Sequence, residues 1–397
     1  MPSRWRVNSL AEPEIYLAVA LSARALAVAA RRAGRRIVVA DLFGDTDTRA
    51  SAEASLVVDG DFDDGFDAAA LLAAAERLAP AASPPRCGLV YGSGLESHPE
   101  LLAQLAIGRR LFGNAPATVA RTKNPRAFFA LLDRLDLPYP AISYAPPPDP
   151  AGWLMKRIGG SGGGHVGPAQ AGVGPNGGCY FQRRIAGRPV GASFLADGGR
   201  ALLLGFSEQW STPGSYRFGG LLQPAAIGPR TAAAIPAALD ALTGELGLVG
   251  LNSLDLIVDG DDFAILEVNP RPGANLDVFD RADSAGLFGL HIAACEGRLP
   301  ERWTPPPQAT AMSVLYAERT LRVPRQLSWP AWVADRPAPG ARIDAGAPIC
   351  TVLAAAPSRA AVREAIAART AHVFSELNDV EESAMVAAAE ETSDHVH

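Results

Sequence analysis

The feature that most restricts the fold of this chain is a pair of alternating segments at residues 250–273, which read GLNSLDLIVDGDDFAILEVNPRPG. Each segment alternates apolar and polar residues with a period of two, which is typical of strands that bury one face. Gly260 to Asp262 form the predicted loop of a β-hairpin, so that Asp259 pairs with Phe263. One face is then predicted to contact a core through Leu254, Leu256, Val258, Ala264, Leu266 and Val268.

The other face of this predicted hairpin gathers oxygen-bearing side chains. In the same register Asp255 lies opposite Glu267, and alternation along the strand places Asn269 on the same side. Two like charges in this position are unfavourable unless a cation lies between them, and hard oxygen ligands suit Mg²⁺. Arg271 follows at once, and its guanidinium group can hold a phosphoryl or carboxylate group. The alternative is that both carboxylates simply face water.

A second informative segment is WLMKRIGGSGGGH at residues 153–165, where Lys156 precedes five glycines. The chain has 36 lysine plus arginine residues, yet lysine occurs only at Lys123 and Lys156. Because the flanking residues have strand patterns, the glycine loop is predicted to be a lid whose backbone N–H groups can bind phosphate oxygens. Lysine is a compact charge suited to one phosphate oxygen, and arginine does not replace it. A flexible connector without a function is the alternative.

The N-terminal part of the chain alternates predicted strands and helices between residues 10 and 115, which is typical of a parallel α/β unit. Ser22 is expected to cap the first helix. No GxGxxG sequence follows the first strand, so no dinucleotide site is predicted. The predicted strands are Ile15 to Leu21, Arg36 to Leu42 and Cys87 to Tyr91, and the predicted helices include Ala23 to Arg32 and Asp67 to Leu78.

The C-terminal two thirds predict a different architecture, so the fold class is α/β at the N-terminus and α+β overall. Short apolar segments with glycine turns at residues 153–222 are typical of an antiparallel sheet. Further on, we expect a strand at Ala311 to Tyr316, a hairpin within residues 336–354 and an amphipathic helix at Ser358 to Asn378. The apolar stripe of that helix is Val362, Ile366, Val373 and Leu377.

Lys123 ahead of a predicted helix, Lys156 before the glycine loop, Asp255 and the sequence LEVNPRPG together resemble the ATP-grasp superfamily over about residues 110–300. The resemblance implies ATP and Mg²⁺ or Mn²⁺ as cofactors, with Asp255, Glu267 and Asn269 as metal ligands. It also implies four regions: an α/β domain (1–115), a two-lobed ATP-grasp domain (116–300), a hairpin-and-helix extension (301–380) and a polar tail (381–397). The implied nucleotide-binding residues are Lys123, Lys156, Gly160, Ser161, Gly162, Gly163, Gly164, Gln182, Arg183, Arg184 and Ile185.

One part of the implied nucleotide site departs from the family pattern. The family's linker usually reads Gln-Glu-hydrophobic-hydrophobic-x-Gly and binds adenine through its backbone, whereas residues 181–185 read FQRRI. Arg183 therefore occupies the position of a common acidic residue, and the contact to ribose is not predicted. His165 is a further candidate for contact with the nucleotide.

The resemblance implies an ADP-forming ligase that makes a C–N bond. ATP would phosphorylate a carboxylate, and an amine would attack the acyl phosphate, with Arg271, Lys156 and Arg217 as catalytic residues. A narrower and fainter resemblance is to methanofuran-type glutamate ligases of one-carbon cofactor biosynthesis. Two alternatives stay open, namely a carboxylase that forms carboxyphosphate from bicarbonate and a non-catalytic ATP-binding module.

Other polar loops give weaker hypotheses. In the sequence GSGLE, Glu96 is a candidate to hold a substrate amine, with Ser93 beside it, because open α/β sheets bind ligands at the ends of their strands. A plain strand-to-helix turn is the alternative for Glu96. The acidic loop DLFGDTDT at residues 41–48 is interpreted as a solvated loop rather than as a metal site.

The overall composition excludes some functions. The net charge of -6 and the lack of a basic run argue against nucleic-acid binding, and no apolar segment has the length of a membrane span. The four cysteines have no metal-binding spacing, so they are expected to be reduced thiols of a cytoplasmic protein. The expected partners are small-molecule carboxylate and amine substrates, and a homodimer is kept as a hypothesis.

Overall fold

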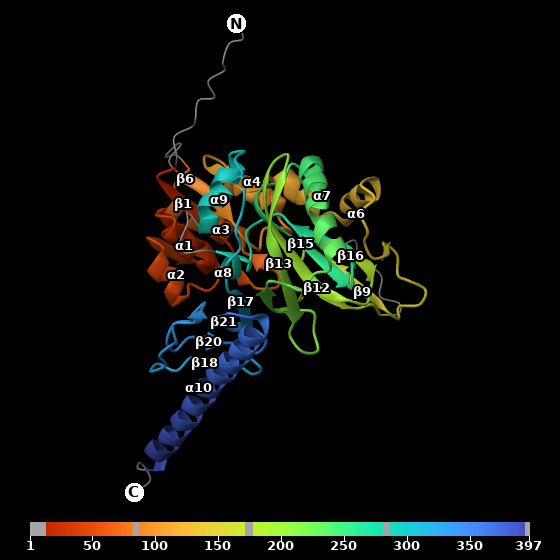
Figure 1. Cartoon of the computed structure of the whole chain (residues 1–397). Coiled ribbons are helices and arrows are strands. Elements are labelled where there is room, and N and C mark those ends of the chain that lie inside the picture. The colour runs from red at the N-terminus through yellow and green to blue at the C-terminus, as the bar shows by residue number, and fades with distance from the viewer. Residues whose placement is uncertain (1–12, 82–86, 171–177, 281–285, 394–397) are drawn as a thin grey trace.

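The computed structural model describes residues 13–81, 87–170, 178–280 and 286–393 (Figure 1). Its N-terminal part is a five-stranded parallel sheet in the order β3-β2-β1-β6-β7. Helix α1 packs on one face of this sheet and helices α3 and α4 pack on the other, which explains why its central strands are almost entirely apolar. The strands are β1 Ile15–Val19, β2 Ile37–Asp41, β3 Ala54–Val57, β6 Cys87–Tyr91 and β7 Arg110–Phe112. The helices are α1 Arg24–Arg32, α2 Thr46–Ser51, α3 Ala68–Leu78 and α4 Pro99–Leu105, and β4 Gly60–Asp61 pairs with β5 Gly65–Phe66 in a small hairpin.

Two predictions about this part were wrong. Ser22 does not cap α1, because the hydroxyl of Ser22 donates a hydrogen bond to Asp335 at 2.8 Å. The acidic loop is not simply solvated, since Asp41 and Asp45 are buried and α2 begins directly after Asp45. Both errors have one cause: a distant segment around Asp335 packs against the ends of these strands.

A four-stranded antiparallel sheet in the order β10-β9-β11-β8 carries the glycine loop between β9 and β10. Lys123 is the last residue of helix α5, and α6 begins two residues later, as the sequence predicted. The elements are α5 Pro116–Lys123, α6 Pro125–Arg134, β8 Ile142–Ser143, β9 Trp153–Arg157, β10 Val166–Pro168 and β11 Cys179–Arg183.

The largest sheet has eight antiparallel strands in the order β16-β15-β12-β13-β14-β17-β21-β19. Helices α6 and α7 share a core with its first strands, while α10 packs on β17 and β21. The strands are β12 Arg188–Asp197, β13 Ala201–Ser211, β14 Phe218–Gln223, β15 Val249–Asp259, β16 Asp262–Asn269, β17 Ala309–Tyr316, β19 Val333–Ala334 and β21 Pro348–Ala356. The helices beside this sheet are α7 Pro229–Leu246, α8 Leu276–Phe279 and α9 Gly286–Cys295.

The β15–β16 hairpin confirms the predicted pairing of Asp255 with Glu267 but corrects the turn. Asp259 pairs with Asp262 rather than with Phe263, so the loop is one residue shorter than predicted. A β-bulge directly after Asp255 absorbs this difference and restores the predicted register at the carboxylates. On the apolar face, Ile265 is fully buried, whereas the predicted core residues Ala264 and Leu266 are only half-buried.

The C-terminal part differs from the expectation in its strand partners. Within residues 336–354, β20 Arg342–Ile343 pairs with β18 Leu321–Arg322, whereas β21 pairs with β17 and β19. The expected stripe of helix α10 is buried at all four positions, namely Val362, Ile366, Val373 and Leu377.

Helix α10 runs from Arg359 to Ser393 and extends away from the rest of the molecule, so most of the predicted polar tail is helical (Figure 1). That stretch contains no glycine or proline and is rich in alanine and glutamate, which favours a helix. In the described part of the chain, no helix combines the length and the apolar character needed to cross a bilayer.

Candidate active site

Asp255 and Glu267 face each other across β15 and β16, and Asn269 follows on the same side. The Asn269 amide donates from Nδ2 to Asp255 Oδ2 at 2.9 Å. Gln209 of β13 donates to the other oxygen of Asp255 at 3.0 Å. Sequence reasoning missed Gln209, although its spacing of two residues from Ser207 and from Ser211, which places three polar side chains on one face of the strand, is a signal that could have found it. These contacts fix the carboxylate of Asp255 in one orientation.

Lys123 reaches this cluster from the end of α5. Its Nζ donates to Glu267 Oε2 at 2.8 Å and to Asn269 Oδ1 at 2.9 Å. Although burial alone raises the pKa of Glu267, the ammonium groups of Lys123 and Lys156 lower it to about 2. Burial, and then the Glu267 carboxylate, raise the pKa of Asp255. The pair therefore holds one firmly ionised carboxylate beside one whose charge is disfavoured until a cation approaches.

Lys156 lies on β9 and is only 8% exposed. Burial lowers the pKa of Lys156, while the carboxylates of Glu267 and Asp255 act in the opposite direction. Among the described residues, its Nζ has no hydrogen-bond or ion-pair partner. A buried ammonium group without a partner is costly, so this geometry favours an anion between Lys156 and the carboxylates.

The glycine loop is packed tightly against β14 and the turn before it. Phe218 N donates to Gly162 O at 2.8 Å. A Cβ atom at Gly163 would lie 1.9 Å from the backbone oxygen of Tyr216, and its φ of +78° is one that L side chains rarely adopt. A Cβ atom at Gly160 would overlap the ring of His165. Bulkier residues could not form this closed arrangement.

The loop is also joined to the N-terminal part of the chain. Arg157 pairs with Asp64 at 2.7 Å, and Arg217 pairs with Asp63 at 3.2 Å. The Arg217 guanidinium also donates to Gly346 O and lies over the ring of Tyr316. Arg217 thus joins the N-terminal part of the chain to its C-terminal part.

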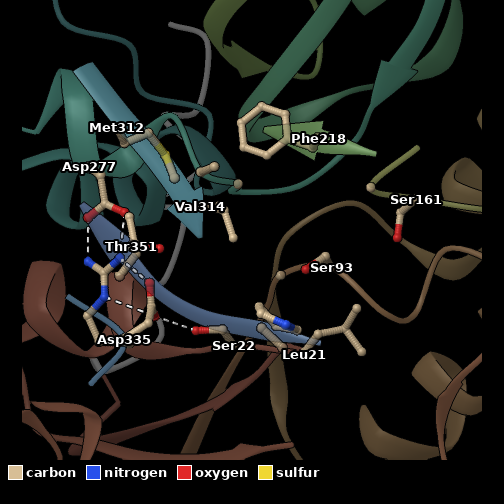
Figure 2. Close-up of a pocket in the computed structure, with 18 of the residues that line it drawn as sticks. Leu21, Ser22, Ser93, Ser161, Phe218, Asp277, Met312, Val314, Asp335 and Thr351 are labelled. Carbon is tan, nitrogen blue, oxygen red and sulfur yellow. Dashed lines mark hydrogen bonds and ion pairs between the residues drawn. The ribbon is translucent and has the colours of Figure 1, made fainter. Parts of the chain in front are cut away.

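A cavity of about 600 Å³ lies beside the carboxylates and extends between the N-terminal sheet and the C-terminal strands. Its walls include apolar side chains of Leu21, Phe218, Met312 and Val314, with Ser161 of the glycine loop on one side and Asp277 and Asp335 on the other (Figure 2). Of the predicted site residues, Ser93, Ser161, Gly162, Gly163, Asp255, Glu267, Asn269 and Arg271 line this cavity.

Comparison with family models then identifies the central region. Residues 123–275 match a model described as an ATP-grasp domain. This chain contains an ATP-grasp domain. The matched residues begin at Lys123 and include the glycine loop and both carboxylates.

The fold of most of the chain is similar to that of solved carboxylase and synthetase structures. A biotin carboxylase from Campylobacter jejuni superposes with a TM-score of 0.68 at 15% identity, covering 88% of this chain and 89% of that chain. An N5-carboxyaminoimidazole ribonucleotide synthetase superposes with a TM-score of 0.65 at 16% identity, covering 94% of this chain and 100% of that chain. The biotin carboxylase domain of a Hydrogenobacter thermophilus 2-oxoglutarate carboxylase superposes with a TM-score of 0.65 at 12% identity, covering 86% of each chain. A comparison with curated protein sequences gives no match.

In the segment that the sequence predicts to be the nucleotide-binding linker, residues 181–185, several backbone donors already have partners. The N–H groups of Arg183 and Arg184 donate to carbonyl oxygens of Ala141 and Gly152, each at 2.8 Å. The Arg183 side chain turns toward Ala151 O, 3.1 Å away. Gln182 is buried, and its Nε2 has no hydrogen-bond partner among the described residues.

The exposed Ile185 completes this segment, and its N–H finds no backbone acceptor in the part of the chain that the structure describes. Burial lowers the pKa of His165, which accordingly favours the neutral imidazole beside the glycine loop.

Glu96 does not line the cavity, and its carboxylate is paired with Arg271 instead. The two side chains form a buried ion pair, and Glu96 Oε2 also accepts from Gly94 N at 2.7 Å and Leu95 N at 3.1 Å. Burial by itself raises the pKa of Glu96, but the Arg271 guanidinium outweighs it and the pKa is lowered. Glu96 therefore orients Arg271 toward the carboxylate hairpin in this arrangement.

Of the cysteines, Cys350 lines the cavity, whereas Cys87, Cys179 and Cys295 do not, and neither does His291. Cys87, Cys179, Cys295 and Cys350 are free, as the sequence predicted. The His291 ring accepts from Leu251 N at 2.9 Å and lies 3.1 Å from Phe112 O, which is a structural role.

Proposed function

We propose that this protein is an ATP-dependent, ADP-forming carboxylate–amine ligase that works through an acyl phosphate. The observation that carries the proposal is the approach of two buried lysines to one half-buried pair of carboxylates beside a closed glycine loop. Lys123 contacts Glu267 directly, and Lys156 holds a buried charge with no partner among the described residues. Such a site favours a polyanion with a bound cation.

Two polar groups without partners among the described residues fit a nucleotide. The buried Nε2 of Gln182 can donate to a ring nitrogen of a base, and the ammonium group of Lys156, a residue that is 8% exposed, can donate to a phosphate oxygen. The tight loop at Ser161 to Gly163 offers backbone N–H groups to the same phosphates. These three features support ATP as the phosphoryl donor.

The residues also fit a divalent cation. Asp255, Glu267 and Asn269 present hard oxygen donors on one face, which is the donor set that Mg²⁺ or Mn²⁺ prefers. No group of three or more His, Cys, Asp or Glu side chains suited to a metal occurs in the described residues, so phosphate oxygens or water would complete the coordination. When bound there, the ion would neutralise negative charge on the phosphates.

The chain's own residues then have distinct tasks. Lys156 neutralises a non-bridging oxygen as a carboxylate oxygen attacks the γ-phosphorus and ADP leaves. Arg271, held by Glu96, orients the carboxylate and its acyl phosphate. The amine nitrogen then attacks the carbonyl carbon, phosphate leaves, and a proton is released from nitrogen. The closed loop excludes water from this intermediate.

A carboxylase is the second candidate, because biotin carboxylases are among the similar structures. The cavity favours the first proposal, since about 600 Å³ is far larger than bicarbonate requires. Within the ligase proposal, glutamate is the first amine to test. We further propose a cytoplasmic enzyme, on the basis of its free cysteines, and keep the expected domain boundaries and homodimer as parts of the proposal.

The test is an ADP-release screen that combines carboxylates, amino acids, amines and bicarbonate with Mg·ATP. A ligase releases ADP only with a carboxylate, and product forms only when an amine is added. Release that requires bicarbonate and no amine selects the carboxylase instead. Tight nucleotide binding without ADP release across the whole panel selects a non-catalytic module.

A further inference from the structure

The end of the cavity remote from the glycine loop is unusually acidic. Asp41, Asp45, Asp277 and Asp335 gather around Arg24, and we call these four carboxylates with Arg24 the acidic end. Figure 2 shows Asp277, Asp335 and Ser22 on the side of the cavity opposite Ser161. None of these residues has a task in the proposed phosphoryl transfer.

Most of the charges at the acidic end are already satisfied. The guanidinium of Arg24 pairs with both Asp277 and Asp335, and Asp335 also accepts from Ser22. Asp41 accepts from Gly44 N at 2.9 Å and from Ala23 N at 3.4 Å. The guanidinium of Arg24 is therefore paired with two carboxylates, and backbone N–H groups donate hydrogen bonds to a third.

Asp45 is the exception. It lines the cavity and is only 5% exposed, yet its carboxylate has no hydrogen-bond or ion-pair partner in the described part of the chain. An aspartate at this position usually caps the following helix, but here it makes no side-chain cap. A buried carboxylate without a donor is unfavourable, and neighbouring carboxylates make it more so.

The geometry points to a cationic ligand: we propose that Asp45 binds the ammonium group of a substrate, at the end remote from the reacting group. Calling this ligand a substrate rests on the proposed function, whereas the binding does not. A metal ion is disfavoured because the guanidinium of Arg24 already occupies the acidic end and pairs with both Asp277 and Asp335. The apolar walls at Leu21, Phe218, Met312 and Val314 fit a hydrocarbon body between the two ends.

The electrostatics of the free protein agree with this assignment. Burial, and then the carboxylates of Asp335, Asp41 and Asp47, raise the pKa of Asp45 to about 8, while Arg24 opposes them. An arriving ammonium group adds the positive charge that this carboxylate lacks. The same cation would also offset the negative charge of the acidic end, where four carboxylates surround the single positive charge of Arg24.

The test compares binding to the wild type and to two variants of the full chain by ligand-observed NMR at pH 8.5. The probe is 4-phenylbutylammonium, and its neutral counterpart is 4-phenylbutan-1-ol. We expect the ammonium to bind the wild type and Asp45→Asn to weaken it about tenfold or more, because an ionic hydrogen bond is lost. The alcohol should bind more weakly and equally to both proteins. Asp59→Asn, an exposed aspartate outside the cavity, is the matched control.

Three results would each overturn the inference. These are unchanged binding of the ammonium by Asp45→Asn, binding of the alcohol to the wild type as tight as that of the ammonium, and an equal loss of ammonium binding in Asp59→Asn. Failure of the ammonium to bind the wild type would overturn it too. If Asp45→Asn does not fold, Asp45→Ser gives the same comparison, because serine also precedes helices well. An Asp45-dependent ammonium site in a protein that never releases ADP would refute the proposed function alone, and the converse result would refute only this inference.

Discussion

At the scale of single residues, the site depends on charges that are wholly or partly removed from water. Lys156 is buried and Glu267 is half-buried in one cluster of opposite charges, and burial disfavours the charge of each one. Asp45 shows the same effect without a compensating partner among the described residues. These three residues therefore give the sharpest expectations for substitution.

Lys156→Arg should impair ATP use although the net charge is unchanged. The planar guanidinium is larger than an ammonium group and cannot place one compact charge in a site that is 8% exposed. We expect kcat/KM for ATP to fall about ten- to a hundredfold, which corresponds to a weakened charged hydrogen bond. Steady-state kinetics measure this, and near-normal KM and kcat would refute the assignment of Lys156.

Glu267→Gln should abolish ADP formation while the fold persists. Glutamine keeps the shape and can accept from Lys123, but it removes the charge that a divalent cation requires. Activity should fall at least about 100-fold, with an unchanged circular dichroism spectrum. Retained turnover in the folded variant would remove Glu267 from the proposed metal site.

Asp45→Asn should change how stability depends on pH. The folded-state pKa of Asp45 is raised to about 8, so folding binds a proton that the unfolded chain releases near pH 4. The wild type therefore loses stability as pH rises from about 4 to about 8, by up to a few kcal/mol. Melting curves should show the variant more stable than the wild type at pH 9 and nearly equal at pH 4. A difference that is the same at both pH values would contradict the buried charge.

At the scale of secondary-structure elements, two devices position the site: a bulged hairpin and a glycine loop with a close contact. The bulge after Asp255 keeps both carboxylates on one face despite a two-residue turn. The loop between β9 and β10 approaches the backbone of Tyr216 so closely that only glycine fits at Gly163. Local sequence determines the hairpin, whereas the close contact of the loop joins Gly163 to Tyr216 in a separate segment of the chain.

Substitutions in the glycine loop can separate strain from closure. Gly162 and Gly163 both have positive φ, but a Cβ atom at Gly162 would meet nothing within 4 Å, whereas at Gly163 it would meet Tyr216 O. Gly162→Ala should cost about 1 kcal/mol of backbone strain, and Gly163→Ala should in addition prevent closure. We expect nucleotide affinity, measured by calorimetry, to fall much further for Gly163→Ala. Equal losses in the two variants would contradict the closed loop.

The sequence predicts these local elements well because periodicity encodes them. The strand at Cys87 to Tyr91 and the hairpin pairing of Asp255 with Glu267 agree with the structure. What the sequence could not predict depends on distant partners. Ser22 binds Asp335 instead of capping its helix, and the loop that begins at Asp41 is covered by the segment around Asp335 and Arg336, nearly three hundred residues away in sequence. No local pattern records such contacts.

At the scale of the whole molecule, the C-terminal strands belong to the same sheet as the carboxylate hairpin, and they close the cavity against the N-terminal sheet. Arg24 joins all three parts of the chain, because it lies on α1 and pairs with Asp277 and Asp335. Its side chain is only 5% exposed. The integrity of the cavity therefore depends on this one guanidinium group.

Arg24→Met should destabilise the molecule strongly. Removing one partner of a buried ionic network leaves Asp277 and Asp335 without their cation, which costs about 3 to 5 kcal/mol. Arg36→Met is the control, because the pair of Arg36 with Glu53 is solvent-exposed and should affect stability little. Urea denaturation compares the two, and similar losses would contradict a special role for Arg24.

The central claim is that a carboxylate attacks the γ-phosphorus of ATP. The most direct test uses the carboxylate found in the ADP-release screen, labelled with ¹⁸O in both oxygens, and follows the label by mass spectrometry of inorganic phosphate. An acyl-phosphate ligase transfers one ¹⁸O atom from the carboxylate to each phosphate formed during amide synthesis. Unlabelled phosphate, or label recovered in AMP, would contradict the proposed chemistry.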